Sequence, residues 1–399
     1  MSSQTLITPT IFTKETLTIL QNNLVAAGKV NRQFENQFVK IGTTINVRKP
    51  NKFIVKSGPA LQIQDINEPS VAITINLQKH VDFQFSSQDL TLTVEEFRER
   101  YWKPGAEELA SALDFDTITN FNQIYNEVGT PGTVPNAFSF LANVGQRADE
   151  EAWPQDGRVL ILGPAAYWSM ANGLSGLFVV SVAEPALKGF LAAIANFEIY
   201  EDQNIQSQTV GAYAGTGVVN GAGQTGSNLI TNGWTASITG LLNIGDVITV
   251  AGVNAINPKN RQSTGSLRNF VVTAAVNSDT GGNATIPIYP AITPSPIATP
   301  VAYGTVTASP ASGAAITVKG TASTSYAQNL AFVRDCIGLV SVPLEVPGGV
   351  DFAARQEHRG LSLRVIRAFD INNDVFPCRT DLLYGTSTFY PELGCRLTN

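Results

Sequence analysis

The sequence predicts an α+β fold in which a small β-barrel domain is inserted into a host of helices and strands. Three observations predict it. Residues 207–326 carry only six charged side chains, although 15% of the whole chain is charged. Residues 43–86 alternate between apolar and polar side chains, as strands with one buried face do. Residues 104–129 place apolar side chains at helical spacing.

Residues 1–40 are predicted to form an N-terminal arm. Phe12–Ala27 is expected to be a short amphipathic helix, because Leu17 shares one face with two later leucines. Asn and Gln are frequent around this helix, so we expect the arm to bury little of its own surface. It would then either fray or dock on a neighbouring molecule, with Phe12 and Leu17 as contact residues.

Residues 41–90 are predicted to form an extended β loop. Within Val71–Leu77, every second residue is a large apolar one and the residues between are small or polar. This alternation predicts an antiparallel ribbon with one apolar and one solvent-exposed face. Lys49–Pro69 lies between the strands and contains the turn signal Gly58-Pro59. A long ribbon is only marginally stable alone, so we expect this loop to lie on an adjacent subunit. The expected contact residues are Lys49, Lys52, Phe53, Lys56, Asp65 and Glu68.

Residues 91–206 are predicted to hold a long helix and a mixed α/β domain. Thr93 and Glu96 form a capping box. The main helix is expected to run from Pro104 to Gly129, about two dozen residues. Strands flanked by helices then predict the mixed domain; the segments are a strand at Arg158–Leu162, a helix opened by Pro164, a helix at Leu187–Ala195 and a strand at Phe197–Tyr200.

Residues 207–326 are predicted to form the inserted barrel, and the host resumes over 327–399. Short strands separated by Gly, Pro and Asn turns are typical of small barrels. Gly211–Gly223 is interpreted as a flexible linker, because a phosphate-binding loop would end in Gly-Lys-Ser/Thr. The expected strands are Asp246–Val250, Phe270–Ala275, Thr285–Tyr289, Val301–Thr307 and Ala315–Lys319.

The bulk composition excludes several classes of protein. A hydrophobic content of 43% is sufficient for two or three folding units in 399 residues. The net charge of −6 argues against tight sequence-independent binding of nucleic acid, which needs clustered Lys and Arg. Three scattered cysteines predict no disulfide framework, and neither a signal peptide nor a membrane span is expected, so a cytoplasmic protein is the default.

A search for catalytic chemistry finds no candidate. Only two histidines occur, His80 and His358, and neither belongs to a nucleophile–base pattern. No Cys/His spacing fits zinc, and the acidic run Asp149-Glu150-Glu151 is expected to be a solvated turn. The sequence therefore predicts no catalytic residue, no metal site and no cofactor. One basic cluster is expected to pair with acidic residues of another subunit: Arg355, Arg359, Arg364 and Arg367.

Several segments carry a resemblance to a known family. Cys378–Gly385 and Pro391–Leu397 resemble the closing strands of the coat proteins of short-tailed Salmonella-type phages. Leu241–Val253 and Leu267–Val272 are similar to that subgroup's insertion domain, and Phe332–Val340 to the point where the host resumes. With the order of its parts, the chain resembles the major capsid (coat) proteins of tailed double-stranded-DNA bacteriophages.

The resemblance implies the Hong Kong 97 phage fold, with N-arm, extended loop, spine helix, peripheral domain and axial domain. It implies pentamers and hexamers that close into an icosahedral shell around double-stranded DNA, without sequence-specific binding. Implied partners are copies of the chain, a scaffolding protein, a portal protein and, as further candidates, decoration proteins. The protein would belong to the virion and assemble in the host bacterial cytoplasm.

One departure concerns the contact between neighbouring capsomers. In the resembled subgroup a long charged loop precedes the Gly-Asp strand, whereas Ser227–Leu242 is short and uncharged here. The arm or the extended loop would have to supply that contact instead. Two other readings remain open: a secreted β-rich adhesin or carbohydrate-binding protein, which suits the neutral Thr/Gly-rich module, and a cytoplasmic enzyme with a β insertion.

Overall fold

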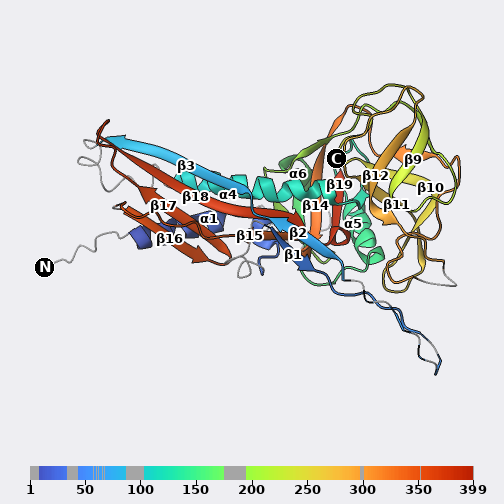
Figure 1. Ribbon diagram of the computed structural model, residues 1–399, viewed down its shortest axis with the longest axis horizontal. Coiled ribbons are helices and arrows are strands. Elements are labelled where there is room, and N and C mark those ends of the chain that lie inside the picture. The colour runs from blue at the N-terminus through green and yellow to red at the C-terminus, as the bar shows by residue number, and fades with distance from the viewer. Residues whose placement is uncertain are drawn as a thin grey trace. The chain divides into compact units, whose positions relative to one another are not determined.

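The computed structural model describes residues 9–33, 44–56, 58–59, 61, 63–64, 66, 68–86, 103–174, 195–296, 301–350 and 352–398. The chain divides into two compact units, each built from separate stretches of sequence (Figure 1). Unit 1 comprises Met1–Val47, Ser70–Thr117 and Ile337–Ser387. Unit 2 comprises Arg48–Pro69, Ile118–Cys336 and Thr388–Asn399.

Unit 1 is built on an antiparallel sheet around one long strand, β18 (Val375–Thr388). β17 pairs with β18 on one side and β16 follows it, while β3 and β15 also pair with β18. Burial alternates along β3, which confirms the period-two pattern seen in the sequence. The bounds are β3 (Leu77–Ser86), β15 (Ile337–Ser341), β16 (Phe352–His358) and β17 (Leu361–Arg367).

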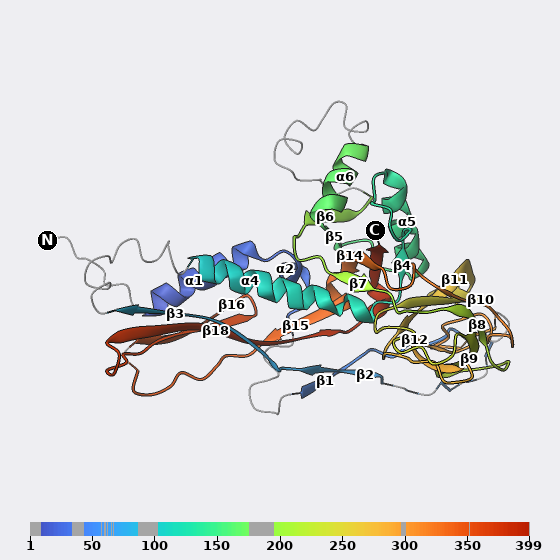
Figure 2. The ribbon, with the colours of Figure 1, turned by 90° about the horizontal axis from the view of Figure 1, so that it is seen from above.

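Helices cover one face of this sheet (Figure 2). They are α1 (Pro9–Asn23), α2 (Ala26–Lys29) and α4 (Lys103–Ile118). Helix α1 packs on β16 and β17. The carboxylate of Asp114 in α4 accepts hydrogen bonds from the backbone N–H groups of Val25 (2.8 Å) and Ala27 (2.6 Å). The Tyr384 hydroxyl of β18 donates to Asp116 of α4 at 2.6 Å.

The N-terminal arm is better anchored than the sequence suggested. Leu17 and Leu20 are 1% and 0% exposed, and Thr13 and Thr16 are also buried. The prediction that the arm buries little of its own surface is therefore wrong for the described residues 9–33. The leucine stripe indeed forms one apolar face, but that face packs on the sheet of the same chain.

Both predicted helices end earlier than expected. Helix α1 stops at Asn23 instead of Ala27, and α4 stops at Ile118 instead of Gly129. Thr119–Gln123 continues as a 3₁₀-helix, and β4 (Glu127–Val128) follows. Thr117 to Asn120 is rich in β-branched and weak helix-forming residues, which accounts for the change. The apolar residues beyond it are still buried, but no longer on a helix; the Thr93/Glu96 capping box lies outside the described residues.

The predicted ribbon of residues 41–90 is divided between two partners. β1 (Thr44–Arg48) pairs with β2 (Ser70–Thr74) as a short two-stranded sheet. β3 pairs with β18 instead, from Leu77 opposite Tyr384 to Ser86 opposite Val375. Its support therefore comes from the same chain and not from a neighbour, which corrects the prediction for this strand.

Unit 2 contains a host sheet with the strand order β4-β19-β14-β5-β6, and β7 pairs with β14. The predicted strand at Arg158–Leu162, the helix from Pro164 and the strand from Phe197 are all confirmed. Of the predicted helix Leu187–Ala195, only Ala195 is described. The bounds are α5 (Phe138–Glu150), β5 (Arg158–Leu162), α6 (Pro164–Leu174), β6 (Phe197–Glu201), β7 (Ser207–Thr209), β14 (Ser325–Val333), η5 (Arg334–Cys336), η6 (Pro391–Leu393) and β19 (Gly394–Thr398).

The insertion forms a barrel with the strand order β13-β10-β11-β12-β9-β8. Strand β8 returns to the segment before β13, because Val219 N–H donates to Ala314 O at 3.0 Å and Gly313 N–H donates to Val219 O at 2.8 Å. One apolar core fills the interior. The bounds are β8 (Gly215–Val219), β9 (Gly226–Trp234), β10 (Val247–Ile256), β11 (Ser263–Val272), β12 (Ala284–Ile292) and β13 (Ile316–Val318).

β10 and β11 are longer than the predicted strands Asp246–Val250 and Phe270–Ala275, and the barrel differs from the prediction at three further places. β8 falls in the stretch interpreted as a flexible linker, so that interpretation is wrong. β9 occupies the beginning of the stretch expected to be a loop. Val301–Thr307 forms no strand: Val306 makes only isolated bridges, to Ala255 and Pro294. The sequence carries no strand signal for β8 because this segment is rich in glycine. Gly217 is required there because the Trp234 ring leaves no room for a Cβ atom.

Candidate functional site

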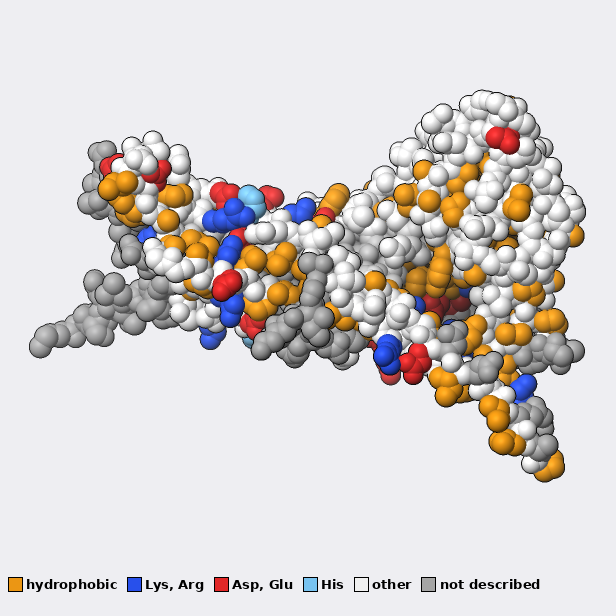
Figure 3. All heavy atoms as spheres, viewed as in Figure 1, with side chains coloured by type: hydrophobic (Ala, Val, Ile, Leu, Met, Phe, Trp, Pro, Cys, Tyr) orange, Lys and Arg blue, Asp and Glu red, His pale blue; other side chains and the backbone are white. Residues whose placement is uncertain are grey.

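The segment between β1 and β2 presents an unusual number of large hydrophobic side chains to solvent. Figure 3 shows hydrophobic side chains on this segment of the surface. Scattered exposed apolar residues are ordinary on soluble proteins, whereas a group of them marks an interaction surface. We call the group the apolar loop surface; it consists of Phe53 (61% exposed), Val55 (95%), Leu61 (87%), Ile63 (86%) and Ile66 (73%).

The base of this segment is fixed to the body of unit 2. The ammonium group of Lys52 lies 3.7 Å from Glu392 Oε1. The backbone N–H of Lys52 donates to the hydroxyl of Tyr303 at 3.3 Å, and that hydroxyl donates to Asn51 Oδ1 at 3.4 Å. Tyr303 belongs to the insertion, so the barrel and the host both hold the base of the loop.

Lys49 strengthens the same attachment. Its ammonium group lies 4.8 Å from the centroid of the Tyr390 ring, a cation–π distance. Burial lowers the pKa of Lys49 below its ordinary value, and the carboxylate of Glu392 opposes this effect. Lys49 therefore serves the base of the loop within its own chain, although the sequence assigned it to a contact with another subunit.

Further along, the two limbs of the segment brace each other. The backbone N–H of Ile54 donates to Gln64 Oε1 at 2.8 Å, and Gln64 Nε2 donates back to Ile54 O at 2.6 Å. Arg48 and Glu68 form a solvent-exposed ion pair at 3.2 Å, a kind that contributes about 0–1 kcal/mol. The limbs are thus linked by polar contacts while the hydrophobic side chains point to solvent.

The remaining predicted contact residues do not form one site. Phe53, Lys56 and Glu68 are exposed on the segment, as expected of contact residues. Leu17 is buried in unit 1, so its side chain packs inside its own chain. Arg355 lies in the middle of β16 and Arg359 directly follows that strand; both are exposed, in unit 1. Asp65 and the side chain of Phe12 lie outside the described residues.

The basic cluster around β17 is partly used inside the chain. Arg364 makes a bidentate contact with Asp381, with N–O distances of 2.9 and 2.6 Å. Asp381 is fully buried, and Arg379 also contacts it at 3.0 Å. Arg367 lies over the rings of Phe352 and Phe376. The prediction of a partner on another subunit is therefore wrong for Arg364.

A second functional feature is the joint between barrel and host in unit 2. Arg268 on β11 pairs with Glu151, which follows α5, at 2.6 Å, and both side chains are about 5% exposed or less. The Arg268 guanidinium lies 4.5 Å from the Tyr125 ring centroid. Burial alone would lower the pKa of Arg268, but Glu151 and Tyr125 together outweigh it and raise that pKa above its ordinary value.

This pair corrects the expectation that Asp149-Glu150-Glu151 is a solvated turn. Asp149 is exposed, but Glu151 is buried beneath the barrel. Asn269 of the same strand donates to Glu127 O at 3.1 Å and Ser266 contacts Glu150 at 3.3 Å. Sequence reasoning missed the joint because Arg268 and Glu151 lie 117 positions apart; the only signal was that a nearly uncharged module retains this arginine.

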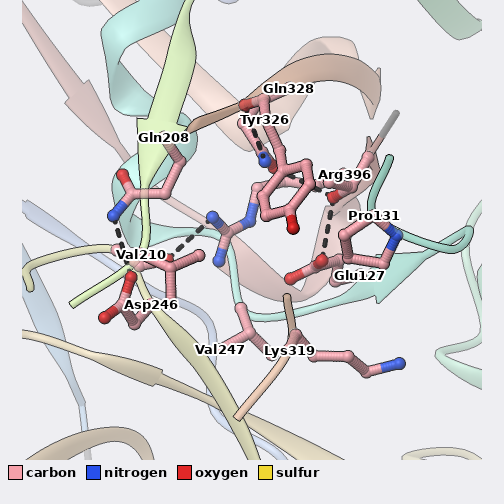
Figure 4. A pocket seen from close by; sticks show the side chains of 12 residues that line it. Glu127, Pro131, Gln208, Val210, Asp246, Val247, Lys319, Tyr326, Gln328 and Arg396 are labelled. Atoms are coloured by element: carbon pink, nitrogen blue, oxygen red, sulfur yellow. Dashed lines mark hydrogen bonds between the residues drawn. The ribbon is translucent and has the colours of Figure 1, made fainter. Parts of the chain in front are cut away.

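Arg396 on β19 forms the other half of the joint. Figure 4 shows its guanidinium between Asp246 of the barrel and Glu127 of the host. Arg396 is 1% exposed and donates from Nη1 to Gly245 O at 2.8 Å. Burial lowers the pKa of Arg396, opposed by Glu127 and Asp246. A buried cation from the host thus holds a carbonyl at the start of the barrel.

Asp246 organises the chain where it enters the barrel. Its carboxylate accepts from the backbone N–H groups of Gly211 (2.9 Å) and Asn243 (2.8 Å) and from Gln208 Nε2 (3.0 Å). Burial raises the pKa of Asp246, and these hydrogen bonds oppose the rise. The joint is therefore polar, directional and specific to one orientation of the barrel on the host within unit 2.

The described residues contain no group of three or more His, Cys, Asp or Glu side chains that could hold a metal ion. Of the two histidines, His80 lies 2.7 Å from Asp82 on the exposed face of β3. No helix in the described part of the chain is both long enough and apolar enough to cross a membrane.

Comparison with known proteins agrees with this architecture. A protein of Mycobacterium phage Che8 aligns over 94% of this chain and 90% of its own, at 13% identity and a TM-score of 0.50, which shows a common fold. A chain from the capsid structure of the Cyanophage P-SCSP1u aligns over 90% of this chain and 84% of its own, at 10% identity and a TM-score of 0.44. The CUS-3 coat protein I-domain aligns over 26% of this chain and 96% of its own, at 27% identity and a TM-score of 0.20.

The comparison with curated protein sequences finds no match. The family model described as "P22 coat protein - gene protein 5" matches residues 1–399, the whole chain. The predicted tailed-phage capsid fold with an inserted barrel is thereby confirmed. The chain belongs to the P22 coat protein family: it is a structural protein of the virion, a major capsid protein whose copies assemble into an icosahedral shell.

Proposed function

We propose that the apolar loop surface is the principal contact between adjacent copies of the chain. Its large side chains are 61–95% exposed in the single chain, which supports this role. Burying one such side chain contributes roughly 1.5–3 kcal/mol. A few of them per contact, repeated over a shell, would suffice for stable assembly even though each contact is individually weak.

The attachment of the loop supports the same proposal. Lys49, Asn51 and Lys52 fix its base to their own unit, and Gln64 braces its two limbs. This arrangement reduces the conformational entropy that a fully flexible loop would lose on docking. Lys49 and Lys52 therefore position the loop, while Phe53 and the hydrophobic residues after it make the contact.

Membership of the family supports a finer description of the capsid. The copies would form pentamers and hexamers around a scaffolding protein and a portal protein, and would enclose double-stranded DNA without reading its sequence. Decoration proteins are further candidate partners. The exposed Arg355 and Arg359, together with Phe12, would supply secondary contacts. Assembly would take place in the bacterial cytoplasm, and the chain would carry out no catalysis.

The domain organisation that we propose keeps the sequence boundaries. Residues 1–40 form the arm and 41–90 the extended loop. Residues 91–206 supply the spine helix, the peripheral domain and the first part of the axial domain. Residues 207–326 form the inserted barrel, and 327–399 complete the axial and peripheral domains.

The test changes the hydrophobic side chains without removing the base of the loop. We expect the triple variant Val55→Ser, Leu61→Ser, Ile63→Ser to remain a folded, soluble monomer and to form no shells with scaffolding protein. Sedimentation and negative-stain microscopy measure assembly, and circular dichroism measures folding. Deletion of Lys49–Pro69 should give the same phenotype.

A matched control addresses loss of exposed hydrophobic surface in general. Ile230 and Ile244 of the barrel are 49% and 51% exposed. The double variant Ile230→Ser, Ile244→Ser should assemble as the parent does. Normal shells from the triple loop variant would overturn the proposed contact.

A further inference from the structure

The chain contains three Asn-Gly pairs: Asn172-Gly173, Asn220-Gly221 and Asn232-Gly233. An asparagine before glycine can cyclise, because the nitrogen of the next residue can attack the side-chain amide carbon. Glycine favours this attack since it has no Cβ atom to obstruct it. The local structure decides which pair reacts, because the side chain and the following peptide group must be free to meet.

Two of the three pairs are held by regular structure. Asn172-Gly173 lies in α6, where Gly173 packs so closely on the carbonyl of Asn136 that no Cβ would fit. Asn232-Gly233 lies in β9, with Asn232 opposite Val218 of β8 and Gly233 against the carbonyl of Thr216. Each pair would have to open locally before a ring could close.

The third pair lies in the exposed turn between β8 and β9. Gly221 has a φ of 97°, in the region that favours glycine. Within the described part of the chain, the Asn220 side chain makes no hydrogen bond, and the N–H of Gly221 donates none. Both reacting groups are therefore free of hydrogen bonds to that part of the chain and lie on residues exposed to water.

Gln224 activates the same peptide group. Its Nε2 donates to Asn220 O at 2.8 Å and to Gly221 O at 3.1 Å. A hydrogen bond to the Asn220 carbonyl stabilises negative charge on that peptide group, so the Gly221 nitrogen loses its proton more easily. The backbone N–H of Asn220 donates to Ile230 O at 3.0 Å, which holds the turn in place while the side chain stays free.

We propose that Asn220 is a site of spontaneous deamidation. The deprotonated Gly221 nitrogen bonds to Cγ of Asn220, the Cγ–Nδ2 bond breaks, and the amide nitrogen leaves as ammonia. Water then adds to either carbonyl of the cyclic imide and opens it to an aspartate or an isoaspartate at position 220. Water is the only co-reactant, and no oxidant is consumed.

The modification would change a nearly uncharged surface. Residues 207–326 contain six charged side chains, and the new carboxylate would be a seventh. The net charge of each modified copy would become one unit more negative than −6. Because the reaction needs no enzyme, the fraction of modified copies would record the age of the folded protein.

The experiment incubates the folded full-length chain at mildly alkaline pH and follows the three peptides by mass spectrometry. Asn220 should convert at least about tenfold faster than Asn172 or Asn232, which are limited by local opening. The rate should rise with pH, and labelling by an isoaspartate-specific methyltransferase should locate the isoaspartate at position 220. In the chemically unfolded chain, all three pairs should convert at comparable rates.

The control variant is Asn220→Gln, which keeps the amide but must close a larger and slower ring. It should fold as the parent does and release ammonia from this peptide far more slowly than the parent. Equal rates at Asn220 and Asn232 in the folded chain, or no conversion of Asn220 while the unfolded chain reacts, would overturn the proposal.

Discussion

Two arginines hold the inserted barrel against its host, and they do so with different chemistry. Arg268 is neutralised by one close carboxylate, Glu151. Arg396 faces Glu127 and Asp246 without a close ion pair, and its Nε and Nη2 have no hydrogen-bond partner within the described protein. Removing one member of a buried pair is costly because the other charge is then left uncompensated.

Glu151→Ala should therefore destabilise the chain by about 3–5 kcal/mol, because it leaves Arg268 buried without its carboxylate. Urea unfolding of the unassembled chain measures the free energy of unfolding. The comparison variant is Glu68→Ala, which breaks the ion pair with Arg48 at 3.2 Å, where both side chains are exposed (51% and 79%). Its cost should be about 1 kcal/mol or less. Equal costs for the two variants would contradict this account of the joint.

Asp202 carries a pH dependence of stability. Burial raises its pKa, and hydrogen bonds from the backbone and side chain of Asn204 oppose the rise. The backbone N–H of Asn204 donates to Oδ1 at 2.8 Å, and Oδ2 is buried without a hydrogen-bond partner among the described residues. The folded chain binds this proton more tightly than the unfolded chain. Between the unfolded value of about 3.9 and the raised folded value, stability therefore falls as pH rises.

Asp202→Asn should raise the melting temperature at neutral pH, because it removes a buried charge and keeps the acceptor for Asn204. The gain should shrink as pH falls and vanish below about pH 4, where the parent carboxyl is protonated in both states. Scanning calorimetry across this range measures the difference. A gain that is constant with pH would show that ionisation of Asp202 is not its source.

At the level of elements, strand β8 decides whether the barrel closes. It is short and rich in glycine, and it meets the segment before β13 through backbone hydrogen bonds of Val219. The Trp234 ring lies over Gly217 with its indole N–H donating to Thr231 Oγ1 at 2.8 Å. A side chain at position 217 would have to displace this ring from the core.

Gly217→Ala should lower the free energy of unfolding by about 1–3 kcal/mol, the usual cost of overpacking. Trp234 fluorescence should report the displaced ring. Gly348→Ala is the matched control, because a Cβ at Gly348 would meet nothing within 4 Å and its backbone is not in the left-handed region. A change in stability as small as that of the control would contradict the proposed packing.

The elements also show what the sequence could predict. Arg158–Leu162, the helix from Pro164 and the strand from Phe197 were predictable because each pairs a strong local pattern with a clear start signal. The end of α4 was not, because Phe121 to Val128 keeps an apolar pattern that a strand-and-turn segment satisfies equally well. β8 was not predictable because its glycines give no strand pattern, and the reason for Gly217 is a tertiary contact with Trp234.

The candidate site, too, could be predicted only in part from the sequence. Composition and turn signals located the loop at Lys49–Pro69, but they could not separate the residues that fix its base from those that face outward. Lys49 and Lys52 contact Tyr390 and Glu392, more than 300 positions away in the sequence, and such pairings depend on the folded chain. The Arg268–Glu151 joint escaped detection for the same reason.

At the scale of the whole molecule, the barrel is integrated with unit 2 rather than appended to it. Its hydrogen bonds and ion pairs reach Glu127, Glu151 and Arg396 of the host. It also contributes Tyr303 to the base of the loop between β1 and β2. Loss of the barrel would therefore expose buried charge in the host and remove one of the contacts that hold the base of the loop.

Excision of residues 207–326 with a short linker should lower the soluble yield of the chain, measured as the supernatant fraction after expression. If uncompensated charge is a main cause, adding Glu151→Gln and Arg396→Met to the excised chain should recover part of the yield. Unchanged yield and normal assembly after simple excision would show that the barrel has no folding role.

Strands β7 and β14 run side by side where the chain leaves and rejoins the host, with Ser207 opposite Ala327. The two ends of the insertion therefore lie one inter-strand spacing apart on the host, about 4.8 Å. Such a layout makes the site a natural splice point for foreign domains whose own termini are adjacent. A grafted enzyme or antigen would need to reproduce the polar joint and the Tyr303 contact with the base of the loop to be displayed on every copy of the particle.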